Sequence, residues 1–574
     1  MTADVAVGVH AGVPGMRVAE VVGRVLAACG VRHVFGVVGS GNFHTTNALV
    51  AAGARFVAAA HEGGAASMAD GYARTSGSVG VLSVHQGPGV TNALTGIVEA
   101  AKSRTPMLVL APEATAPRSN FFIDLPHTAA ALGVDYRPVR PEHAAADVAH
   151  AYRTAALGRT VVLGLPLDVQ ARKVPAWPGP LASRPVPGKP VPDEPVPDEP
   201  VSDEPVPDVG PLVEALSTAQ RPVFVAGRGA RAAREPLARL ADECAALLAV
   251  SAAAKGLFAG DPWYLDVSGG FATPLAAELI GEADLVVAWG SSLNMWTTRH
   301  GRLISPSATV VAVDDLPAGA ELNPRVQRHV SGDVAVVARH ALRRLEREPA
   351  ATRPIRTQRT PELKRRIAEQ GRWRNVAYPD AGGGGRIDPR TLSIALDDLL
   401  PAERTVVVDS GNFMGYPSMF LSVPDVAGFC FTQAFQSVGL GLASALGAAV
   451  ARPDRLTVAA LGDGGFLMSA TELVTAARLG LPLLVVVYDD AAYGAEVHHF
   501  GPDGHPLDLV RFPDTDLGAI ARGYGCAALT VRGVDGLAPL RDWLAGPKDR
   551  PLVLDAKITD DGGSWWLAEA FRGH

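Results

Sequence analysis

Two aspartates, each placed just after an apolar run, have the type and spacing that chemistry at a metal would need. Residues 456–461 are strand-like and are followed shortly by Asp463, and residues 483–488 form a second apolar run before Asp490. Parallel strands end at the same edge of their sheet, so we expect Asp463 and Asp490 to meet outside two carboxyl ends. Oxygen ligands held in this way suit Mg²⁺, which is usually shared with the phosphates of a substrate or cofactor.

The glycines around Asp463 fit the same interpretation. Residues 462–465 read Gly-Asp-Gly-Gly, which predicts a turn too rich in glycine for a helix, with helical spacing from 469 to 479. At such a turn or helix start, the backbone N–H groups of Gly464 and Gly465 would face phosphate oxygens. The alternative is an ordinary strand, turn and helix that carries two surface acids.

This segment resembles the thiamin-diphosphate motif of the acetolactate synthase, benzoylformate decarboxylase and pyruvate decarboxylase superfamily, which reads GDG and, farther on, an Asn pair. Asp463 matches the GDG aspartate, and YGAE at 493–496 matches the text after the pair. The resemblance implies thiamin diphosphate and Mg²⁺ as cofactors. It also implies a set of ligands and contacts: Asp463, Asp490 and the Ala492 carbonyl on the metal, with Gly464, Gly465, Tyr493 and Gly494 in the cofactor site.

The chain departs from that motif at the pair itself, where Asp489 and Asp490 stand in place of two asparagines. Aspartate at 490 can still supply an oxygen to Mg²⁺. It also adds a negative charge beside an anionic diphosphate. We therefore expect metal affinity to survive and cofactor affinity to be altered.

The composition describes a globular protein with large cores. The 574 residues are 48% hydrophobic and 19% charged, with a net charge of −7, and no basic surplus suggests nucleic acid or an anionic membrane as a partner. The four cysteines are scattered without a CxxC pair, which is typical of reduced thiols. The N-terminus has no basic segment followed by an apolar core, and no run of 18 apolar residues occurs, so the expected location is the cytoplasm.

Alternating helix and strand signals predict an α/β protein made of three doubly wound parallel-sheet domains. A pyrimidine-binding domain is expected at 15–180 and a Pro/Asp/Glu-rich linker at 181–209, which reads as a spacer. A Rossmann-like middle domain follows at 210–350 and a diphosphate-binding and magnesium-binding domain at 385–574. Some relatives bind flavin in the middle domain. Gly227-Arg228-Gly229 is only a weak nucleotide fingerprint, so the sequence leaves flavin open.

The stretch HEGGAASMADGYAR, 61–74, resembles the family element whose glutamate activates the cofactor by protonating its pyrimidine ring. Glu62 is the matching residue. An acid is also common at the start of a helix, so a solvated helix-start glutamate is the alternative.

Two further stretches align with family elements that hold the cofactor. In QSVGLGLASALG, Val438 falls at the apolar wedge that bends the cofactor, and the Gln436 carbonyl falls where the cofactor amine binds. A core valine that touches no ligand is the alternative for Val438. In DSGNF, which follows the strand 405–408, Asn412 and the backbone of Phe413 are candidates for contact with the diphosphate.

The residues on the substrate side point to a decarboxylase. His85 in VHQGPGVTN coincides with a histidine that benzoylformate decarboxylase turns toward the thiazolium, and Gln86 lies beside it. Ser40 in VVGSGN resembles the residue that the same enzyme uses for the substrate carboxylate. A histidine satisfied by a backbone carbonyl is the alternative for His85. The phenylalanine–glutamine pair and the lysine of acetolactate synthase are replaced in 121–133, with no lysine before Lys173.

The resemblance therefore predicts an enzyme that decarboxylates a 2-oxo acid and ligates the carbanion to a second carbonyl compound, like acetolactate synthase. A simple decarboxylase of the benzoylformate type is the alternative, and a non-catalytic homologue is a third reading. In this superfamily the activating glutamate serves a cofactor held by another subunit, so a homodimer or homotetramer is expected.

Overall fold

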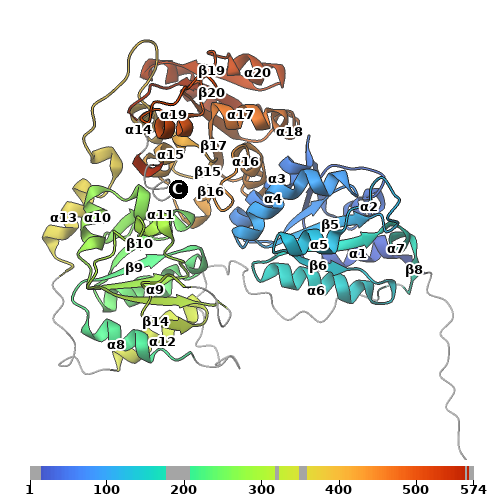
Figure 1. Ribbon diagram of the computed structural model, residues 1–574, viewed down its shortest axis with the longest axis horizontal. Coiled ribbons are helices and arrows are strands. Elements are labelled where there is room, and N and C mark those ends of the chain that lie inside the picture. The colour runs from blue at the N-terminus through green and yellow to red at the C-terminus, as the bar shows by residue number, and fades with distance from the viewer. Residues whose placement is uncertain are drawn as a thin grey trace, which may run out of the picture. The chain divides into compact units, whose positions relative to one another are not determined.

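The computed structural model describes residues 15–175, 177, 207–316, 322–347, 358–562 and 565–567. The chain divides into two compact units, Met1–Lys189 and Pro190–His574, and each is described by itself. The predicted linker 181–209 lies outside the described residues except for 207–209. Three six-stranded sheets, in which every neighbouring pair of strands is parallel, confirm the predicted α/β fold class (Figure 1).

The first unit holds one of these sheets, with strand order β3-β2-β4-β5-β7-β6, and a short antiparallel pair β1-β8. Its strands are β1 (Met16–Arg17), β2 (His33–Gly36), β3 (Arg55–Ala58), β4 (Gly80–Ser83), β5 (Met107–Glu113), β6 (Asp135–Pro138), β7 (Thr160–Pro166) and β8 (Lys173–Val174). Its helices are α1 (Val18–Ala28), α2 (Phe43–Ala51), α3 (Glu62–Ser76), α4 (Pro88–Lys102), α5 (Leu125–Ala131), α6 (Ala144–Ala156) and α7 (Leu167–Ala171).

Helix α3, which begins at the predicted Glu62, and helix α4, which follows the predicted His85 and Gln86, pack on each other and are joined by buried charges. The Arg74 guanidinium lies 2.8 Å from an Asp70 oxygen and 2.7 Å from a Glu99 oxygen, and both carboxylates are almost fully buried. Burial raises the pKa of Asp70. A buried charge must be paired, so this network fixes the position of α3 against α4.

The second unit begins with the middle sheet, whose strand order is β11-β10-β9-β12-β13-β14. Its strands are β9 (Pro222–Ala226), β10 (Leu247–Val250), β11 (Tyr264–Val267), β12 (Leu285–Trp289), β13 (Thr309–Asp314) and β14 (Arg328–Ser331). Its helices are α8 (Gly210–Thr218), α9 (Arg234–Glu243), α10 (Pro274–Gly281), α11 (Met295–Thr298), α12 (Val334–Glu346) and α13 (Pro361–Gln370).

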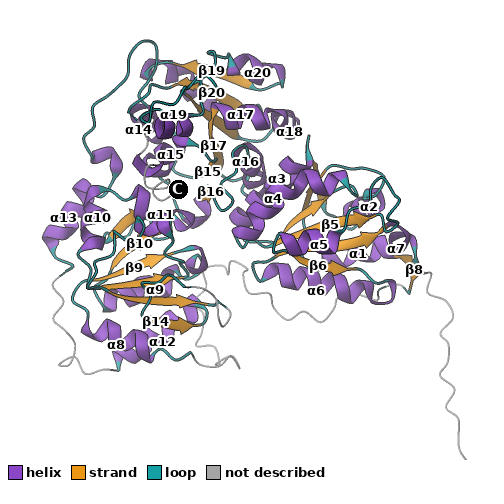
Figure 2. Ribbon diagram, viewed as in Figure 1, coloured by secondary structure: helices purple, strands orange, loops and turns teal. Residues whose placement is uncertain are grey.

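Alternation along β9 explains the two covered faces of the middle sheet. Val223 and Val225 belong to a core shared with α10 and α13, whereas Phe224 belongs to the core shared with α8, α9 and α12. Figure 2 shows α8 and α12 on one side of this sheet and α10 on the other. A strand buried on both faces reads as a continuous apolar run, which is why β9 and β12 were predictable.

The glycine pair after β9 is explained by close packing of two loops. A Cβ on Gly227 would lie 2.3 Å from the Gly290 carbonyl oxygen, and the Gly229 amide donates to that carbonyl at 3.1 Å. The weak nucleotide fingerprint thus has a structural use.

The third sheet has the order β16-β15-β17-β18-β20-β19. Its strands are β15 (Arg404–Val408), β16 (Phe429–Phe431), β17 (Leu456–Gly462), β18 (Leu483–Asp489), β19 (Ala527–Val531) and β20 (Leu552–Lys557). Its helices are α14 (Pro389–Leu399), α15 (Gly415–Phe420), α16 (Gly441–Ala451), α17 (Asp463–Ser469), α18 (Leu473–Leu479), α19 (Gly494–Phe500), α20 (Leu517–Gly523) and α21 (Ala538–Ala545).

One continuous core joins the middle and third sheets within the second unit. Trp566 is 2% exposed, and its ring packs on Tyr416 and Phe271. Its Nε1 donates to the Asn412 carbonyl at 3.1 Å. The loop that carries Asn412 is therefore fixed from behind.

Two predictions from composition can be compared with the structure. All four cysteines are free thiols, as predicted. Within the described ranges, no helix combines the length and the apolar composition that crossing a membrane requires.

Candidate functional site

Asp463 and Asp490 lie at the carboxyl ends of two adjacent strands, as the sequence predicted. Strands β17 and β18 are paired in parallel, with Gly462 opposite Tyr488. The predicted turn at 462–465 is wrong, because α17 begins directly at Asp463. Glycine is tolerated there because its cost to helix stability is that of a helix interior, and these glycines lie in the first turn. The amides of Gly464 and Gly465 lie in that turn.

The two glycines are required by space. A Cβ on Gly465 would lie 2.4 Å from Asp409 Oδ2 and 3.3 Å from Val438 Cγ1. A Cβ on Gly464 would lie 2.9 Å from Cε1 of the Tyr493 ring. Both distances below 3 Å are shorter than a real carbon atom allows, so any larger residue must displace its neighbours.

The pKa values of Asp463 and Asp490 are both raised by their surroundings. Burial, and then the charge of Asp489, raise the pKa of Asp463 to about 7. Burial, and then the charge of Asp463, raise the pKa of Asp490 to about 8. The amide of Ala492 donates to Asp490 Oδ1 at 3.2 Å. The same amide partly offsets the rise in the pKa of Asp463 by hydrogen bonding to its carboxyl. Two buried carboxyls beside one amide create a place where positive charge is favoured.

The loop after β18 turns sharply and is supported by a second segment. Ala491 has a φ of +57°, a conformation that residues with a side chain seldom adopt. Its carbonyl accepts from the Phe512 amide at 2.8 Å, and the Tyr493 amide donates to the Val510 carbonyl at 2.9 Å. We name residues 510–515 the strap. We name residues 489–493, which contain two of the predicted metal ligands, the metal loop, and the strap holds this loop in its turned conformation.

Cavities reach both aspartates. One of about 300 Å³ is lined by Asp463, Gly464, Tyr493 and Phe512 among others. Another of about 300 Å³ is lined by Asn412, Asp490, Ala492 and Gly494 among others. A Cβ on Gly494 would lie 2.4 Å from Asp490 Oδ2 and 3.0 Å from Asn412 Nδ2, so Gly494 leaves the room that brings these two polar groups together.

Asp409, which the sequence analysis did not single out, anchors the loop of the predicted wedge. It is fully buried and accepts from the amides of Gly439, Leu440 and Gly441 at 2.9, 3.1 and 3.1 Å. Burial raises its pKa to about 6 against the effect of these amides. Val438, one residue before them, is 39% exposed, as a wedge that contacts a ligand requires.

The carbonyl predicted to meet the cofactor amine is held in an unusual conformation. Gln436 has a φ of +60°, and its carbonyl accepts from the Ser410 hydroxyl at 3.4 Å. Phe413 is buried and stacks on Tyr488 at 5.5 Å. These contacts give the predicted cofactor residues a rigid support.

In the first unit, Glu62 is the first residue of α3, and it is oriented by Asn92. The Asn92 side-chain amide donates to Glu62 Oε2 at 3.1 Å. A Cβ on Gly89 would lie 3.4 Å from Glu62 Oε1 and 3.1 Å from His85 Cβ. The glutamate and the histidine thus flank one glycine at the start of α4.

His85 is fixed by a backbone amide rather than a carbonyl. The Gly41 N–H donates to His85 Nδ1 at 3.2 Å, so a neutral ring carries its proton on Nε2. The ring lies edge-to-face with Phe121, with centroids 5.4 Å apart. Phe121 lies in the segment that replaces the acetolactate synthase pair.

The other two predicted substrate residues differ in accessibility. Ser40 is exposed on the loop between Gly39 and Gly41, which packs on His85. Gln86 is 3% exposed and lies against Gly41, and its Oε1 has no hydrogen-bond partner in the part of the chain that the structure describes. A buried oxygen of this kind is available to a ligand.

The predicted residues form two groups, one in each unit. Ser40, Glu62, His85 and Gln86 gather at the carboxyl edge of the first sheet, and the remaining ones gather at the carboxyl edge of the third. Sequence reasoning missed Asn92, Asp409 and Lys557. Lys557 carried a signal, since it is a lysine at the end of an otherwise buried strand.

The donors present fit a magnesium diphosphate. No three His, Cys, Asp or Glu side chains converge on a metal position among the described residues. Two carboxylates and a backbone carbonyl leave coordination positions for phosphate oxygens and water, which is how Mg²⁺ is usually held.

Comparisons with known proteins identify the family. Three thiamine pyrophosphate enzyme models match the chain: the N-terminal TPP binding domain at residues 16–130, the central domain at 209–344 and the C-terminal TPP binding domain at 409–556. The chain is 30% identical to a probable 2-ketoarginine decarboxylase from Pseudomonas aeruginosa, over 91% of this chain and 90% of that protein. The chain therefore belongs to the thiamine pyrophosphate enzymes.

Other relatives carry different names. The chain is 29% identical to the large subunit of acetolactate synthase isozyme 2 from Escherichia coli, over 83% of this chain and 84% of that one. It is 27% identical to a sulfoacetaldehyde acetyltransferase from Alcaligenes xylosoxydans, over 84% of this chain and 83% of that protein.

Gly465→Ala tests the geometry of the cradle. The added methyl must displace Asp409 or Val438, so thiamin diphosphate should bind at least about tenfold more weakly, since a supporting shell typically affects affinity by ~10- to 100-fold. Gly523→Ala is the matched control, because a Cβ there meets no described atom within 4 Å. Calorimetric titration measures both. Equal affinity in Gly465→Ala and Gly523→Ala would contradict the described packing.

Proposed function

We propose that the protein is a thiamin-diphosphate and Mg²⁺-dependent enzyme that decarboxylates a 2-oxo acid and ligates the resulting carbanion to a second carbonyl compound. The observation that carries the proposal is the buried pair Asp463 and Asp490 beside glycines that have no room for a side chain. Residues 385–574 would serve as the diphosphate-binding domain and residues 15–180 as the pyrimidine-binding domain.

In this proposal Asp463, Asp490 and the Ala492 carbonyl hold Mg²⁺, and the amides of Gly464 and Gly465 face the diphosphate. Asn412 and the Phe413 backbone flank it, with Tyr493 and Gly494 on the other side. When bound, thiamin diphosphate would supply a nucleophilic carbon that adds to the 2-oxo group and a cationic ring that accepts the electron pair released as carbon dioxide leaves.

Glu62 is assigned the proton transfer that activates the cofactor. Asn92 holds one of its carboxyl oxygens, Oε2, in a hydrogen bond, which fixes the orientation of the other. A positioned carboxyl of this kind can give a proton to a pyrimidine nitrogen and take it back. The Gln436 carbonyl would hold the amine, and Val438 would support the bent cofactor.

The fate of the substrate carbon separates two candidate functions. Ligation is favoured by relatives named acetolactate synthase and sulfoacetaldehyde acetyltransferase, whose names describe synthesis and group transfer. Simple decarboxylation is favoured by His85, since its Nε2, which the Gly41 amide does not occupy, can pass a proton from water to the carbon that loses carbon dioxide. A relative named as a probable 2-ketoarginine decarboxylase supports that second candidate.

The proposed active form is a homodimer or homotetramer. Leu467 and Met468 on α17 and Val474 on α18 are 49%, 60% and 41% exposed, and apolar side chains gathered on neighbouring elements favour association. Analytical ultracentrifugation combined with an activity assay tests this. A fully active monomer would show the proposal to be wrong.

The functional test is carbon dioxide release from a panel of 2-oxo acids, with and without an acceptor aldehyde, in the parent and in the variants Glu62→Gln and His85→Ala. Glu62→Gln should slow hydrogen–deuterium exchange at the thiazolium carbon by ~10²- to 10⁴-fold, measured by NMR without substrate, because one positioned acid is worth that much. His85→Ala should leave that exchange nearly unchanged and shift products away from released aldehyde.

Two exposed residues provide matched controls, Glu142→Gln and His150→Ala, which should behave like the parent in both assays. No carbon dioxide from any 2-oxo acid in the parent would overturn the proposed reaction. Exchange in His85→Ala as slow as in Glu62→Gln would overturn the division of roles.

A further inference from the structure

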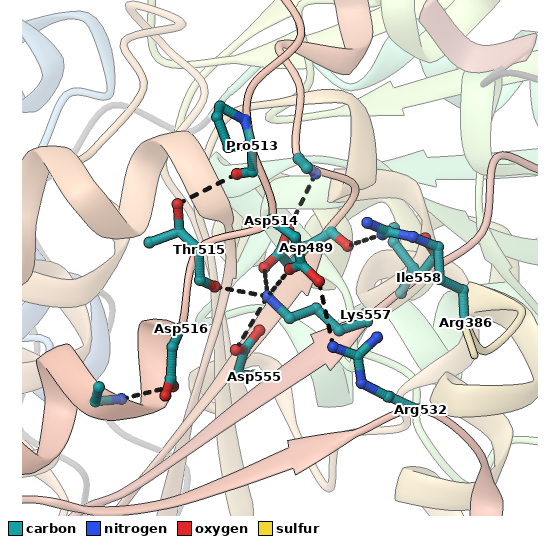
Figure 3. Close-up of polar contacts among 12 residues, drawn as sticks. Arg386, Asp489, Pro513, Asp514, Thr515, Asp516, Arg532, Asp555, Lys557 and Ile558 are labelled. Atoms are coloured by element: carbon teal, nitrogen blue, oxygen red, sulfur yellow. Dashed lines mark hydrogen bonds and ion pairs between the residues drawn. The ribbon is translucent and has the colours of Figure 1, made fainter. Parts of the chain in front are cut away.

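Lys557 is a charged side chain inside the third sheet. It is the last residue of β20, it is 2% exposed, and it lies directly opposite Asp489 in the pairing of β18 with β20. A buried ammonium is strongly unfavourable unless it is fully paired. Figure 3 shows it surrounded by acidic side chains.

The Lys557 ammonium contacts groups from three segments. Its Nζ lies 2.5 Å from Asp489 Oδ2, 2.7 Å from Asp514 Oδ1 and 3.2 Å from Asp555 Oδ2 (Figure 3). It also donates to the Thr515 carbonyl at 2.7 Å. One ammonium therefore joins the end of β18, the strap and β20.

Asp489 transmits this contact to the metal loop. Its Oδ2 binds Lys557, while its Oδ1 accepts from the Ala491 amide at 3.0 Å. Ala491 is the residue with the φ of +57° that turns the chain between Asp490 and Ala492. The orientation of the Asp489 carboxylate thus fixes the turn on which two proposed metal ligands depend.

The strap is held from its other end by the same ammonium. The Phe512 amide donates a hydrogen bond to the Ala491 carbonyl of the metal loop. Farther along the strap, Asp514 forms an ion pair with Lys557, and the Thr515 carbonyl accepts a hydrogen bond from it. Phe512, Pro513 and Thr515 line the cavity that also contains Asp463. Lys557 therefore supports one wall of that cavity as well as the loop.

Among the three carboxyl groups that contact Lys557, Asp489 is its main charge partner. Burial, and then the charge of Asp489, raise the pKa of Asp555 to about 7, so this carboxyl carries only part of a negative charge near that pH. Asp514 has a second cation, because Arg532 Nη2 lies 3.2 Å from its Oδ2. The side chain of Asp489 is 2% exposed and pairs with Lys557. The Arg386 guanidinium also contacts Asp489, but it donates to the backbone carbonyl and not to the carboxylate.

We propose that Lys557 is a positioning residue for the metal loop: its ammonium neutralises Asp489, the aspartate at the first position of the Asp pair, and ties the loop to the strap. The extra charge that aspartate brings at that position is balanced inside the sheet. The inference rests on the proposed function, since it concerns how the chain presents Asp490 and Ala492 to a magnesium diphosphate.

A double-mutant cycle tests the pairing. The four proteins are the parent, Lys557→Met, Asp489→Asn and the double variant, and each is titrated with thiamin diphosphate at saturating Mg²⁺ in a calorimeter. Lys557→Met leaves a buried anion unmatched, so binding should weaken by ~10- to 100-fold, the usual effect of a residue that orients a metal ligand. Asp489→Asn in the same chain removes that anion, so the double variant should recover most of the lost affinity.

Two control variants show whether the loss of affinity is specific to Lys557 and its recovery specific to Asp489. Lys548→Met removes a lysine whose Nζ, within the described ranges, donates only to the Leu544 and Gly546 carbonyls at the end of α21, and this variant should bind the cofactor like the parent. Asp514→Asn combined with Lys557→Met should not recover affinity. In Lys557→Met the Asp514 carboxylate is still paired with Arg532, so removing its charge relieves nothing. Thermal unfolding without cofactor or metal is recorded for every variant as a readout independent of activity.

The possible outcomes are distinct. If Lys557→Met does not fold, the double variant must still fold and bind, because Asp489→Asn removes the carboxylate that Lys557→Met leaves unpaired. A double variant as weak as Lys557→Met, or a Lys557→Met protein that binds like the parent, would overturn the inference. Failure of the parent to bind thiamin diphosphate with Mg²⁺ would instead overturn the proposed function.

Discussion

The repulsion between two buried carboxyl groups, Asp463 and Asp490, is the interaction on which the account of this site depends. Each lies at the end of a parallel strand, and among the described residues the groups that act on them are other carboxylates and backbone amides rather than cations. Burial, and then the charge of a neighbouring carboxylate, raise their pKa values to about 7 and about 8, so both are partly protonated near neutral pH. A divalent ion would replace those protons and convert repulsion into attraction.

Much of the surrounding structure keeps that arrangement rigid. Adjacent parallel strands bring the two carboxyls to one edge, and Gly465 allows Asp409 and Val438 to approach α17. Buried polar groups that are fully bonded specify one conformation, and Asp409 meets this condition through three amides. In the first unit, Asn92 and the Gly41 amide orient Glu62 and His85 in the same manner.

The fold class and the positions of most site residues could be predicted from the sequence because they depend on local patterns. The apolar runs 456–461 and 483–488 were identified to within one residue of β17 and β18, and carboxyl-end residues follow from strand order. The turn at 462–465 was predicted wrongly, since glycine propensity is measured in helix interiors and α17 places its glycines in the first turn. Asn92, Asp409 and Lys557 were missed because their partners are distant in sequence. Lys557 pairs with Asp489 only through the register of β18 and β20.

Proton release on cofactor binding measures the central interaction most directly. Calorimetry of Mg²⁺ and thiamin diphosphate binding near pH 7.5, repeated in buffers of different ionisation enthalpy, gives the number of protons released. Both pKa values are raised in the free protein, so metal binding must expel protons below about pH 8, and apparent affinity must rise with pH until both groups are ionised. Asp490→Asn keeps an oxygen ligand but removes one titrating group and its repulsion of the other, and comparison with it cancels protons that come from the cofactor itself. The account predicts that the parent releases about one proton more than Asp490→Asn. Equal proton release from the two proteins would contradict it.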